Sequence, residues 1–193
     1  MSDRLKQALE SASETRACLI GEALLKEVPD VFRRQFPGKK AVVVADSTTF
    51  GVAGREVQEA LAAAGLAVAA PFVFDAAGLY AEMTCVERLS GALRLNDCVP
   101  VAVGSGTLND LTKLASHRCG RPYLCVGTAA SMDGYTAFGA SITFQGNKQT
   151  FTCPAPRSPP CTISHARAST GSTPSASASS QSAPQTTLAI RSA

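Results

Sequence analysis

The sequence contains no tryptophan, only two histidines and a low share of charged residues, 17%. No apolar run approaches the roughly 18 residues that a transmembrane helix needs, so we expect no membrane span. A formal net charge of +3 is too small to indicate nucleic-acid binding. The N-terminal MSDRLKQALESASETR also lacks the apolar core of a secretory signal peptide. These absences predict a cytoplasmic protein that binds neither nucleic acid nor membrane.

The seven cysteines form no CxxC motif and no cluster with histidine. Their odd number and scattered positions predict reduced, mostly buried thiols without a disulfide framework. His117 lies at the end of a predicted helix and His165 in a Ser-rich segment, and neither has a second ligand at metal-binding spacing. The sequence therefore predicts no metal site within this chain.

What the sequence does contain is an alternation of apolar runs and helical patterns. This alternation predicts a Rossmann-like, doubly wound α/β fold with a mainly parallel sheet. The predicted strands are Thr15–Ile20, Ala41–Asp46, Leu66–Phe74, Val99–Val103 and Tyr123–Val126. The predicted helices are Asp3–Ala12, Gly21–Phe36, Val52–Ala64, Thr84–Leu95 and Thr107–Ser116.

Proline and glycine add detail to this prediction. Pro29 is expected to begin or kink a helical segment, and Gly65 to end the helix before it. Pro71 argues for an edge position of its strand. A terminal β-hairpin is expected from Ala140–Phe144 and Lys148–Thr152, with Gly146 and Asn147 at positive φ in the turn.

The composition changes abruptly after Arg157. Residues 158–193 are dominated by Ser, Ala, Thr and Pro and show no hydrophobic period. Such a segment cannot bury enough apolar surface to offset its ordering entropy. We therefore expect an α/β domain over residues 1–157 and a disordered tail over 158–193.

The first candidate site is the sequence GSGTLND, which lies between a predicted strand and a predicted helix. Glycine lets the backbone approach a phosphate, and the N-terminus of a helix offers free N–H groups. Asn109 stands where the third glycine of the GxGxxG fingerprint would be, so a tight turn with Thr107 as a helix cap remains the alternative. Asp110 could be a solvated acid of the first helical turn or could shape the loop. The predicted cofactor-binding residues here are Gly106, Thr107, Leu108, Asn109 and Asp110.

Two further candidates follow other predicted strands. Asp46 could accept hydrogen bonds from ribose hydroxyls, or it could cap a helix beginning at Ser47. Thr128, Ser131 and Asp133 cluster after the fourth strand among small residues, where they would hold a cofactor and a substrate hydroxyl. A plain polar turn is the alternative interpretation for this last stretch.

The segments VAVGSGTLNDLTKLAS and RPYLCVGTAASMDGYTAFGASITFQGNKQTFTCPAPR resemble the N-terminal nucleotide domain of the sn-glycerol-1-phosphate dehydrogenase family. This family shares a superfamily with glycerol dehydrogenase, iron-containing alcohol dehydrogenase and 3-dehydroquinate synthase. The resemblance covers about residues 14 to 157. Its most discriminating part is SMDGYT.

The resemblance implies reduction of dihydroxyacetone phosphate with NADH or NADPH, a step in phospholipid metabolism, with a zinc or nickel ion that polarises the carbonyl. It implies that Asp46 meets the adenosine ribose, that Gly106–Asp110 hold the pyrophosphate, and that Thr128 and Ser131 are further cofactor contacts. Asp133 would bind the small phosphorylated substrate. No catalytic residue and no metal ligand is assigned in this chain, and a homo-oligomer is left open.

The sequence departs from the family pattern at two places. Ala137 replaces a serine that contacts the cofactor in relatives, and after Arg157 the helical metal-binding domain is absent. A shifted reading frame would account for the tail, and we expect the chain to be inactive alone. Alternative functions are a non-catalytic nucleotide-binding module, or a 3-dehydroquinate synthase-like or polyol dehydrogenase activity.

Overall fold

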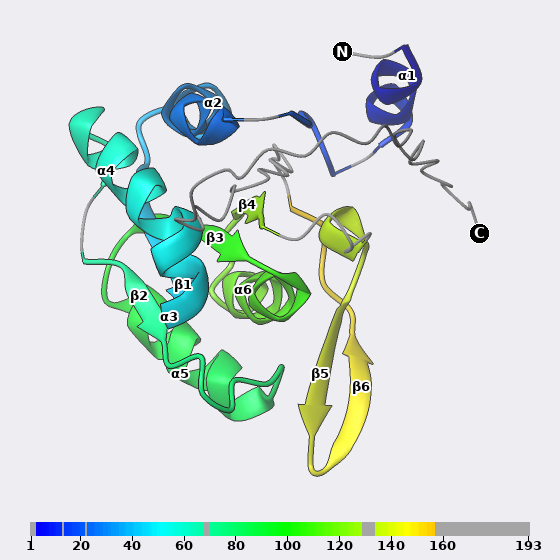
Figure 1. The fold of residues 1–193 in the computed structure, drawn as a ribbon. Coiled ribbons are helices and arrows are strands. Elements are labelled where there is room, and N and C mark those ends of the chain that lie inside the picture. The colour runs from blue at the N-terminus through cyan, green and yellow to red at the C-terminus, as the bar shows by residue number, and fades with distance from the viewer. Residues whose placement is uncertain (1–2, 13, 22, 68–69, 129–133, 157–193) are drawn as a thin grey trace, which may run out of the picture.

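The computed structural model describes residues 3–12, 14–21, 23–67, 70–128 and 134–156. These residues form a parallel four-stranded sheet in the order β2-β1-β3-β4 and an antiparallel hairpin beside it (Figure 1). The sheet strands are β1 (Lys40–Asp46), β2 (Phe72–Phe74), β3 (Cys98–Gly104) and β4 (Leu124–Gly127). The predicted Rossmann-like architecture is confirmed.

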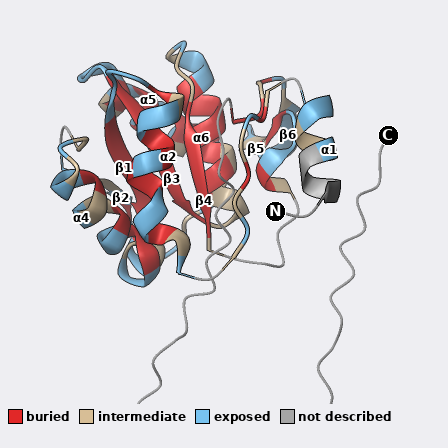
Figure 2. Ribbon diagram, turned by 90° about the horizontal axis from the view of Figure 1, so that it is seen from above, coloured by how far each residue is buried: buried red, intermediate tan, exposed pale blue. Residues whose placement is uncertain are grey.

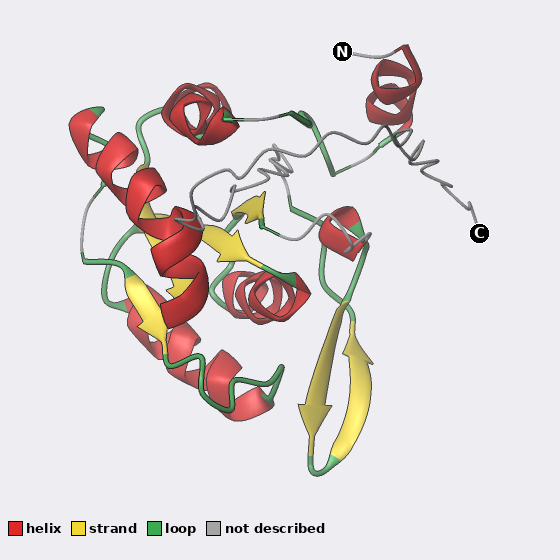
Figure 3. Ribbon diagram, viewed as in Figure 1, coloured by secondary structure: helices red, strands yellow, loops and turns green. Residues whose placement is uncertain are grey.

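Helices cover both faces of the sheet (Figure 3). On one face Val43 and Val101 pack against α2 and α4, and on the other Val42 and Val44 pack against α5 and α6. The strands between these layers are the most buried part of the molecule (Figure 2). The helices are α1 (Asp3–Ser11), η1 (Leu24–Glu27), α2 (Val28–Gln35), α3 (Ser47–Thr49), η2 (Phe50–Gly54), α4 (Arg55–Ala63), α5 (Met83–Arg94), α6 (Gly106–Arg118) and η3 (Gly134–Thr136).

Proline and glycine act largely as the sequence predicts. Pro29 lies in the first turn of α2, and β2 begins directly after Pro71 at the edge of the sheet. Gly65 has a φ of 68° and follows α4. Its N–H donates to the Ala62 carbonyl, and the Leu66 N–H donates to the Leu61 carbonyl, which together form a Schellman motif.

Several predicted elements differ in extent from the structure. The predicted strand Leu66–Phe74 is a strand only over Phe72–Phe74, and the helix predicted from Gly21 begins at Leu24. The predicted strand Thr15–Ile20 is reduced to a single bridge residue, Ile20, although Cys18 and the partly buried Leu19 pack their side chains against the core. The helix predicted from Val52 begins at Ser47 instead, because the side chain of Asp46 caps it. A π-helical turn, η2, then joins this start to α4.

The hairpin consists of β5 (Ala140–Phe144) and β6 (Asn147–Phe151). Its turn residues are Gln145 and Gly146, with φ values of 52° and 77°, while Asn147 pairs with Phe144 inside the ladder. The prediction that Asn147 has a positive φ is therefore wrong. A two-residue turn with both φ values positive matches the twist of paired strands, and that requirement falls on Gln145 here.

Among the helices of the described ranges, none combines the length and apolar character needed to cross a bilayer. None of the cysteines in these ranges forms a disulfide bond, and four of them are buried: Cys18, Cys98, Cys125 and Cys153. The tail predicted to be disordered, residues 158–193, lies outside the described residues.

Candidate functional site

The candidate site lies where the chain changes direction across the sheet. From β1 the chain passes through α3, η2 and α4 to β2 on one side, whereas from β3 it passes through α6 to β4 on the other. The carboxyl ends of β1 and β3 therefore flank a topological switch point, the position at which open α/β sheets form a binding crevice. Asp46 ends β1 and Gly104 ends β3.

A glycine turn connects β3 to α6 at this point. Ser105 is the N-cap of α6, its side chain makes no capping hydrogen bond, and the first backbone bond of the helix runs from the Asn109 N–H to the Ser105 carbonyl at 3.0 Å. The N–H groups of residues 106, 107 and 108 consequently have no acceptor within the helix. Together with the positive end of the helix dipole, they can receive an anionic group.

Close packing brings this helix start onto the sheet. A Cβ atom added to Gly104 would lie only 2.8 Å from Cγ of Leu108, so a larger residue would push α6 away from β3. Leu108 is 1% exposed and Asn109 is 0% exposed. These two predicted cofactor residues thus present no side chain to a ligand, and Leu108 can contribute only its backbone N–H.

Asp46 caps the helix that follows β1. Its Oδ1 accepts the Thr49 N–H at 2.8 Å, and the Thr49 hydroxyl accepts the Asp46 N–H at 3.1 Å. The capping alternative from the sequence is confirmed, and among the described residues no hydrogen bond involves Oδ2. Thr49 also lies next to the glycine turn, because a Cβ on Gly104 would be 3.4 Å from its Oγ1.

Asp110 faces the hairpin rather than open solvent. Its Oδ2 accepts the Ser141 N–H at 3.1 Å, and its Oδ1 lies 3.6 Å from Nζ of the buried Lys113. Burial raises the pKa of the Asp110 carboxyl above its ordinary value, and the Ser141 hydrogen bond and Lys113 oppose that shift. Neither role considered for Asp110 from the sequence describes this arrangement, because its carboxylate bonds to β5 of the hairpin rather than to the glycine turn or to solvent.

The third candidate stretch is only partly described. The Thr128 N–H donates to the Gly104 carbonyl at 3.1 Å, which places Thr128 directly beside the glycine turn. Ser131 and Asp133 lie outside the described residues. Sequence reasoning missed Tyr135, whose hydroxyl donates to the same Gly104 carbonyl at 3.2 Å. The one available signal was Gly127 at the end of β4, a position that leaves room for a large side chain.

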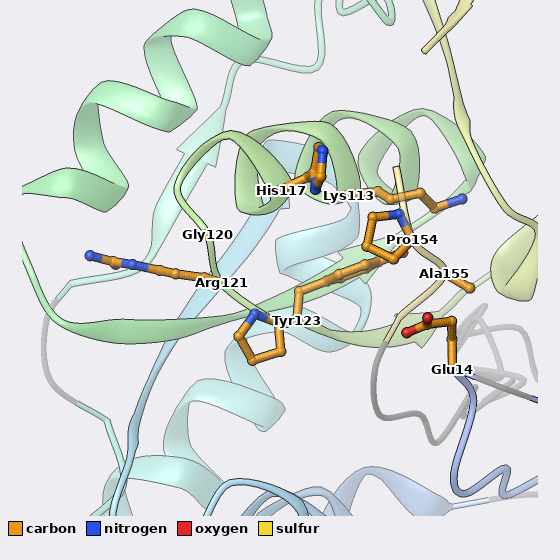
Figure 4. A pocket seen from close by; sticks show the side chains of 9 residues that line it. Glu14, Lys113, His117, Gly120, Arg121, Tyr123, Pro154 and Ala155 are labelled. Carbon is orange, nitrogen blue, oxygen red and sulfur yellow. The ribbon is translucent and has the colours of Figure 1, made fainter. Parts of the chain in front are cut away.

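A separate cleft of about 280 Å³ lies at the other end of α6 (Figure 4). Two of its cationic side chains are engaged elsewhere, since Lys113 donates to the carbonyls of Ala137 and Gly139 and Arg121 donates to that of Leu93. His117 lies in the last turn of α6, as predicted. The cleft is lined by Glu14, Lys113, His117, Gly120, Arg121, Pro122, Tyr123, Pro154 and Ala155.

The metal-ligating residue types do not gather anywhere in the part of the chain that the structure describes. No group of three or more His, Cys, Asp or Glu side chains there could hold a metal ion. The described residues therefore do not fit the zinc or nickel ion that the resemblance implies.

A parallel α/β sheet with a glycine turn and an acidic residue at its switch point defines a Rossmann-like domain. Residues 19–161 match the iron-containing alcohol dehydrogenase family, and the chain belongs to that family.

Curated relatives agree with this assignment. The chain is 37% identical over 117 residues to the glycerol-1-phosphate dehydrogenase [NAD(P)+] of Halalkalibacterium halodurans. This aligned region covers 59% of this chain and 29% of that protein. It is 36% identical over 141 residues to that of Methanosarcina barkeri, covering 73% and 38% respectively. The chain thus spans 29% to 38% of the length of these relatives.

Solved structures show the same fold. Sulfoacetaldehyde reductase from Bifidobacterium kashiwanohense, in complex with NAD+, superposes with a TM-score of 0.63 at 20% identity, covering 79% of this chain and 45% of that one. Glycerol dehydrogenase from Schizosaccharomyces pombe superposes with a TM-score of 0.61 at 20% identity, covering 78% and 36%.

Proposed function

We propose that this chain is the nucleotide-binding part of an NAD(P)H-dependent sn-glycerol-1-phosphate dehydrogenase, which reduces dihydroxyacetone phosphate. The observation that carries the proposal is the start of α6, where three backbone N–H groups without helical acceptors lie beside Asp46 at the switch point. The names of relatives that are 36% and 37% identical support this choice of reaction.

Each part of the crevice has a role in this proposal. The N–H groups of residues 106 to 108, with the hydroxyls of Ser105 and Thr107, bind the pyrophosphate, because a helix N-terminus favours negative charge. Oδ2 of Asp46 accepts a ribose hydroxyl while Oδ1 keeps its capping bond to Thr49. Thr128 lines the crevice from β4, and Ser131 and Asp133 complete the contacts to cofactor and substrate.

The reaction itself needs groups that the described residues do not supply. A bound nicotinamide would supply hydride from its C4 to the ketone carbon, whose oxygen would take up a proton. In this proposal, residues from the portion of the relatives that this chain does not span hold the metal and the substrate phosphate. We therefore expect the 193-residue chain to bind nucleotide without turning over substrate.

A non-catalytic nucleotide-binding module is the second candidate. The glycine turn favours it equally, because a turn that holds pyrophosphate needs no metal. The two candidates differ only in whether the bound nicotinamide is oxidised when the residues that hold the metal and the substrate phosphate are also present.

Calorimetric titration tests the nucleotide site that both candidates share, and an absorbance assay tests whether this chain turns over substrate. We expect the purified chain to bind NADH, with no loss of its absorbance on addition of dihydroxyacetone phosphate with zinc or nickel. Oxidation that depends on substrate and metal would overturn the expected inactivity and support the dehydrogenase. NAD+ reduction with glycerol would indicate a polyol dehydrogenase instead. Absence of any nucleotide binding would contradict both candidates.

A further inference from the structure

We propose that Tyr135 is a positioning residue that fixes the glycine turn between β3 and α6 through contacts with Gly104 and Asn109. The inference rests on the proposed nucleotide site, and it assigns Tyr135 a role in affinity without contact to the ligand. Tyr135 lies in η3 and is 2% exposed.

The side chain of Tyr135 occupies space that glycine leaves open. Gly104 and Gly127 are paired in register at the ends of β3 and β4. A Cβ atom on Gly127 would lie 2.7 Å from Cζ of Tyr135, so the ring lies directly against this backbone. From there the hydroxyl reaches the carbonyl of Gly104, the residue at which the turn begins.

The backbone of Tyr135 is attached to the other side of the turn. Nδ2 of Asn109 donates to the Tyr135 carbonyl at 3.3 Å, and Oδ1 of Asn109 accepts the Tyr123 hydroxyl at 2.9 Å. Asn109 is also the residue whose N–H forms the first backbone bond of α6. Tyr135 therefore contacts the chain at Gly104 and at Asn109, the two points that bracket the free N–H groups.

The hydroxyl of Tyr135 can be removed without breaking the backbone pairing of the sheet. The Gly104 carbonyl also accepts the Thr128 N–H, so the pairing at the ends of β3 and β4 does not depend on the hydroxyl. Removing the hydroxyl would keep the pairing of β3 with β4 and the packing of the ring against Gly127, and would release the Gly104 carbonyl from the side chain. Anion binding by backbone N–H groups depends on their alignment, so this release should weaken pyrophosphate binding.

The test compares Tyr135→Phe with Tyr80→Phe in the full chain. Tyr80 is 67% exposed and serves as the matched control. We measure dissociation constants for NADH, for ADP-ribose and for AMP, which lacks a pyrophosphate, together with the thermal unfolding midpoint. Tyr135→Phe is expected to raise the dissociation constants for NADH and ADP-ribose about three- to tenfold, the effect of losing one buried hydrogen bond. The dissociation constant for AMP should change less than about twofold, because AMP has no pyrophosphate to sense the turn. Tyr80→Phe should leave all three dissociation constants unchanged.

Other outcomes would overturn the inference in distinguishable ways. If wild-type protein binds NADH and Tyr135→Phe binds it equally well, the positioning role is wrong and the nucleotide site stands, whatever the unfolding midpoint. Equal weakening of AMP would show that the hydroxyl does not act through the pyrophosphate turn. If wild-type protein binds no nucleotide, the proposed function fails and the inference fails with it.

Discussion

The ammonium of Lys113 is buried 3.6 Å from the carboxylate of Asp110 on the same helix. It also donates to the Ala137 carbonyl at 2.8 Å and to the Gly139 carbonyl at 2.9 Å. Asp110 in turn accepts the Ser141 N–H. One turn of α6 thereby holds the segment that leads into β5 at three backbone positions.

Lys113→Met should strongly destabilise the fold. The substitution keeps most of the aliphatic volume but removes the donors and leaves a partly buried carboxylate without its cation, which costs about 3 kcal/mol. Chemical denaturation measures this loss. Lys39→Met is the control, because Lys39 pairs with Asp97 on the exposed surface, where an ion pair contributes little. Similar stability of both variants would show that the buried Lys113 does not hold the segment that leads into β5.

Asp110→Asn should change how stability depends on pH. Because burial raises the pKa of Asp110 in the folded state, the folded protein holds this proton more tightly than the unfolded chain does. The resulting stabilisation is present below the unfolded pKa and is lost as pH rises through the folded pKa. The variant has no carboxyl at position 110 and does not lose this stabilisation. Its free energy of unfolding should therefore rise relative to that of the wild type as pH rises from the acid range to neutrality. A constant difference between the two proteins would contradict the assignment.

Asp46→Ser should separate the two roles of Asp46. Serine is also a good N-cap, so the helix start at Ser47 is retained while the carboxylate is lost. NADH binding should weaken about tenfold or more, the effect of losing a charged hydrogen bond. The affinity for NADPH should rise relative to that for NADH, because the substitution removes a negative charge beside the 2′-phosphate of NADPH. Calorimetric titration with both nucleotides measures this change.

The control for that experiment is Asp75→Ser. Asp75 follows the neighbouring strand β2, away from the switch point, and its Oδ1 accepts the Ala77 N–H at 3.0 Å. Its substitution should leave both affinities unchanged. Unaltered NADH binding by Asp46→Ser would show that Asp46 only caps the helix.

Gly127→Ala should destabilise the protein, because its Cβ would overlap the ring of Tyr135. Overpacking of this kind costs about 1 to 3 kcal/mol. Gly91→Ala is the matched control: Gly91 is exposed within α5, and its Cβ would meet nothing within 4 Å. Replacing it should stabilise the helix by about 0.5 to 1 kcal/mol. Thermal and chemical unfolding give both values, and effects of the same sign would contradict this account.

The sequence predicted the strands whose stability comes from continuous apolar burial. β1 and β3 begin within one residue of their predicted starts, because unbroken apolar runs of that length are typical of central strands. Thr15–Ile20 shows the limit of this reasoning. Cys18 is buried and Leu19 partly buried, but Ile20 is 59% exposed, and only Ile20 of this segment has β-bridge pairing.

The candidate site was predictable where it depends on local chemistry. The glycine turn and the capping ability of Asp46 follow from neighbouring residues. The burial of Asn109 and the placement of Tyr135 depend on contacts between residues 26 and 31 positions apart, which no local pattern specifies. Asn109 was therefore assigned to the cofactor because it follows a glycine turn, although its amide group is hydrogen-bonded to two tyrosines.

Hydrogen–deuterium exchange with and without saturating NADH tests the central claim most directly, because it locates the nucleotide on the chain. The account predicts slower exchange of the amides in residues 105–108 and 46–49, with little change in the hairpin 140–151 or in the cleft around His117. Protection confined to the His117 cleft, or no protection at the glycine turn, would contradict it.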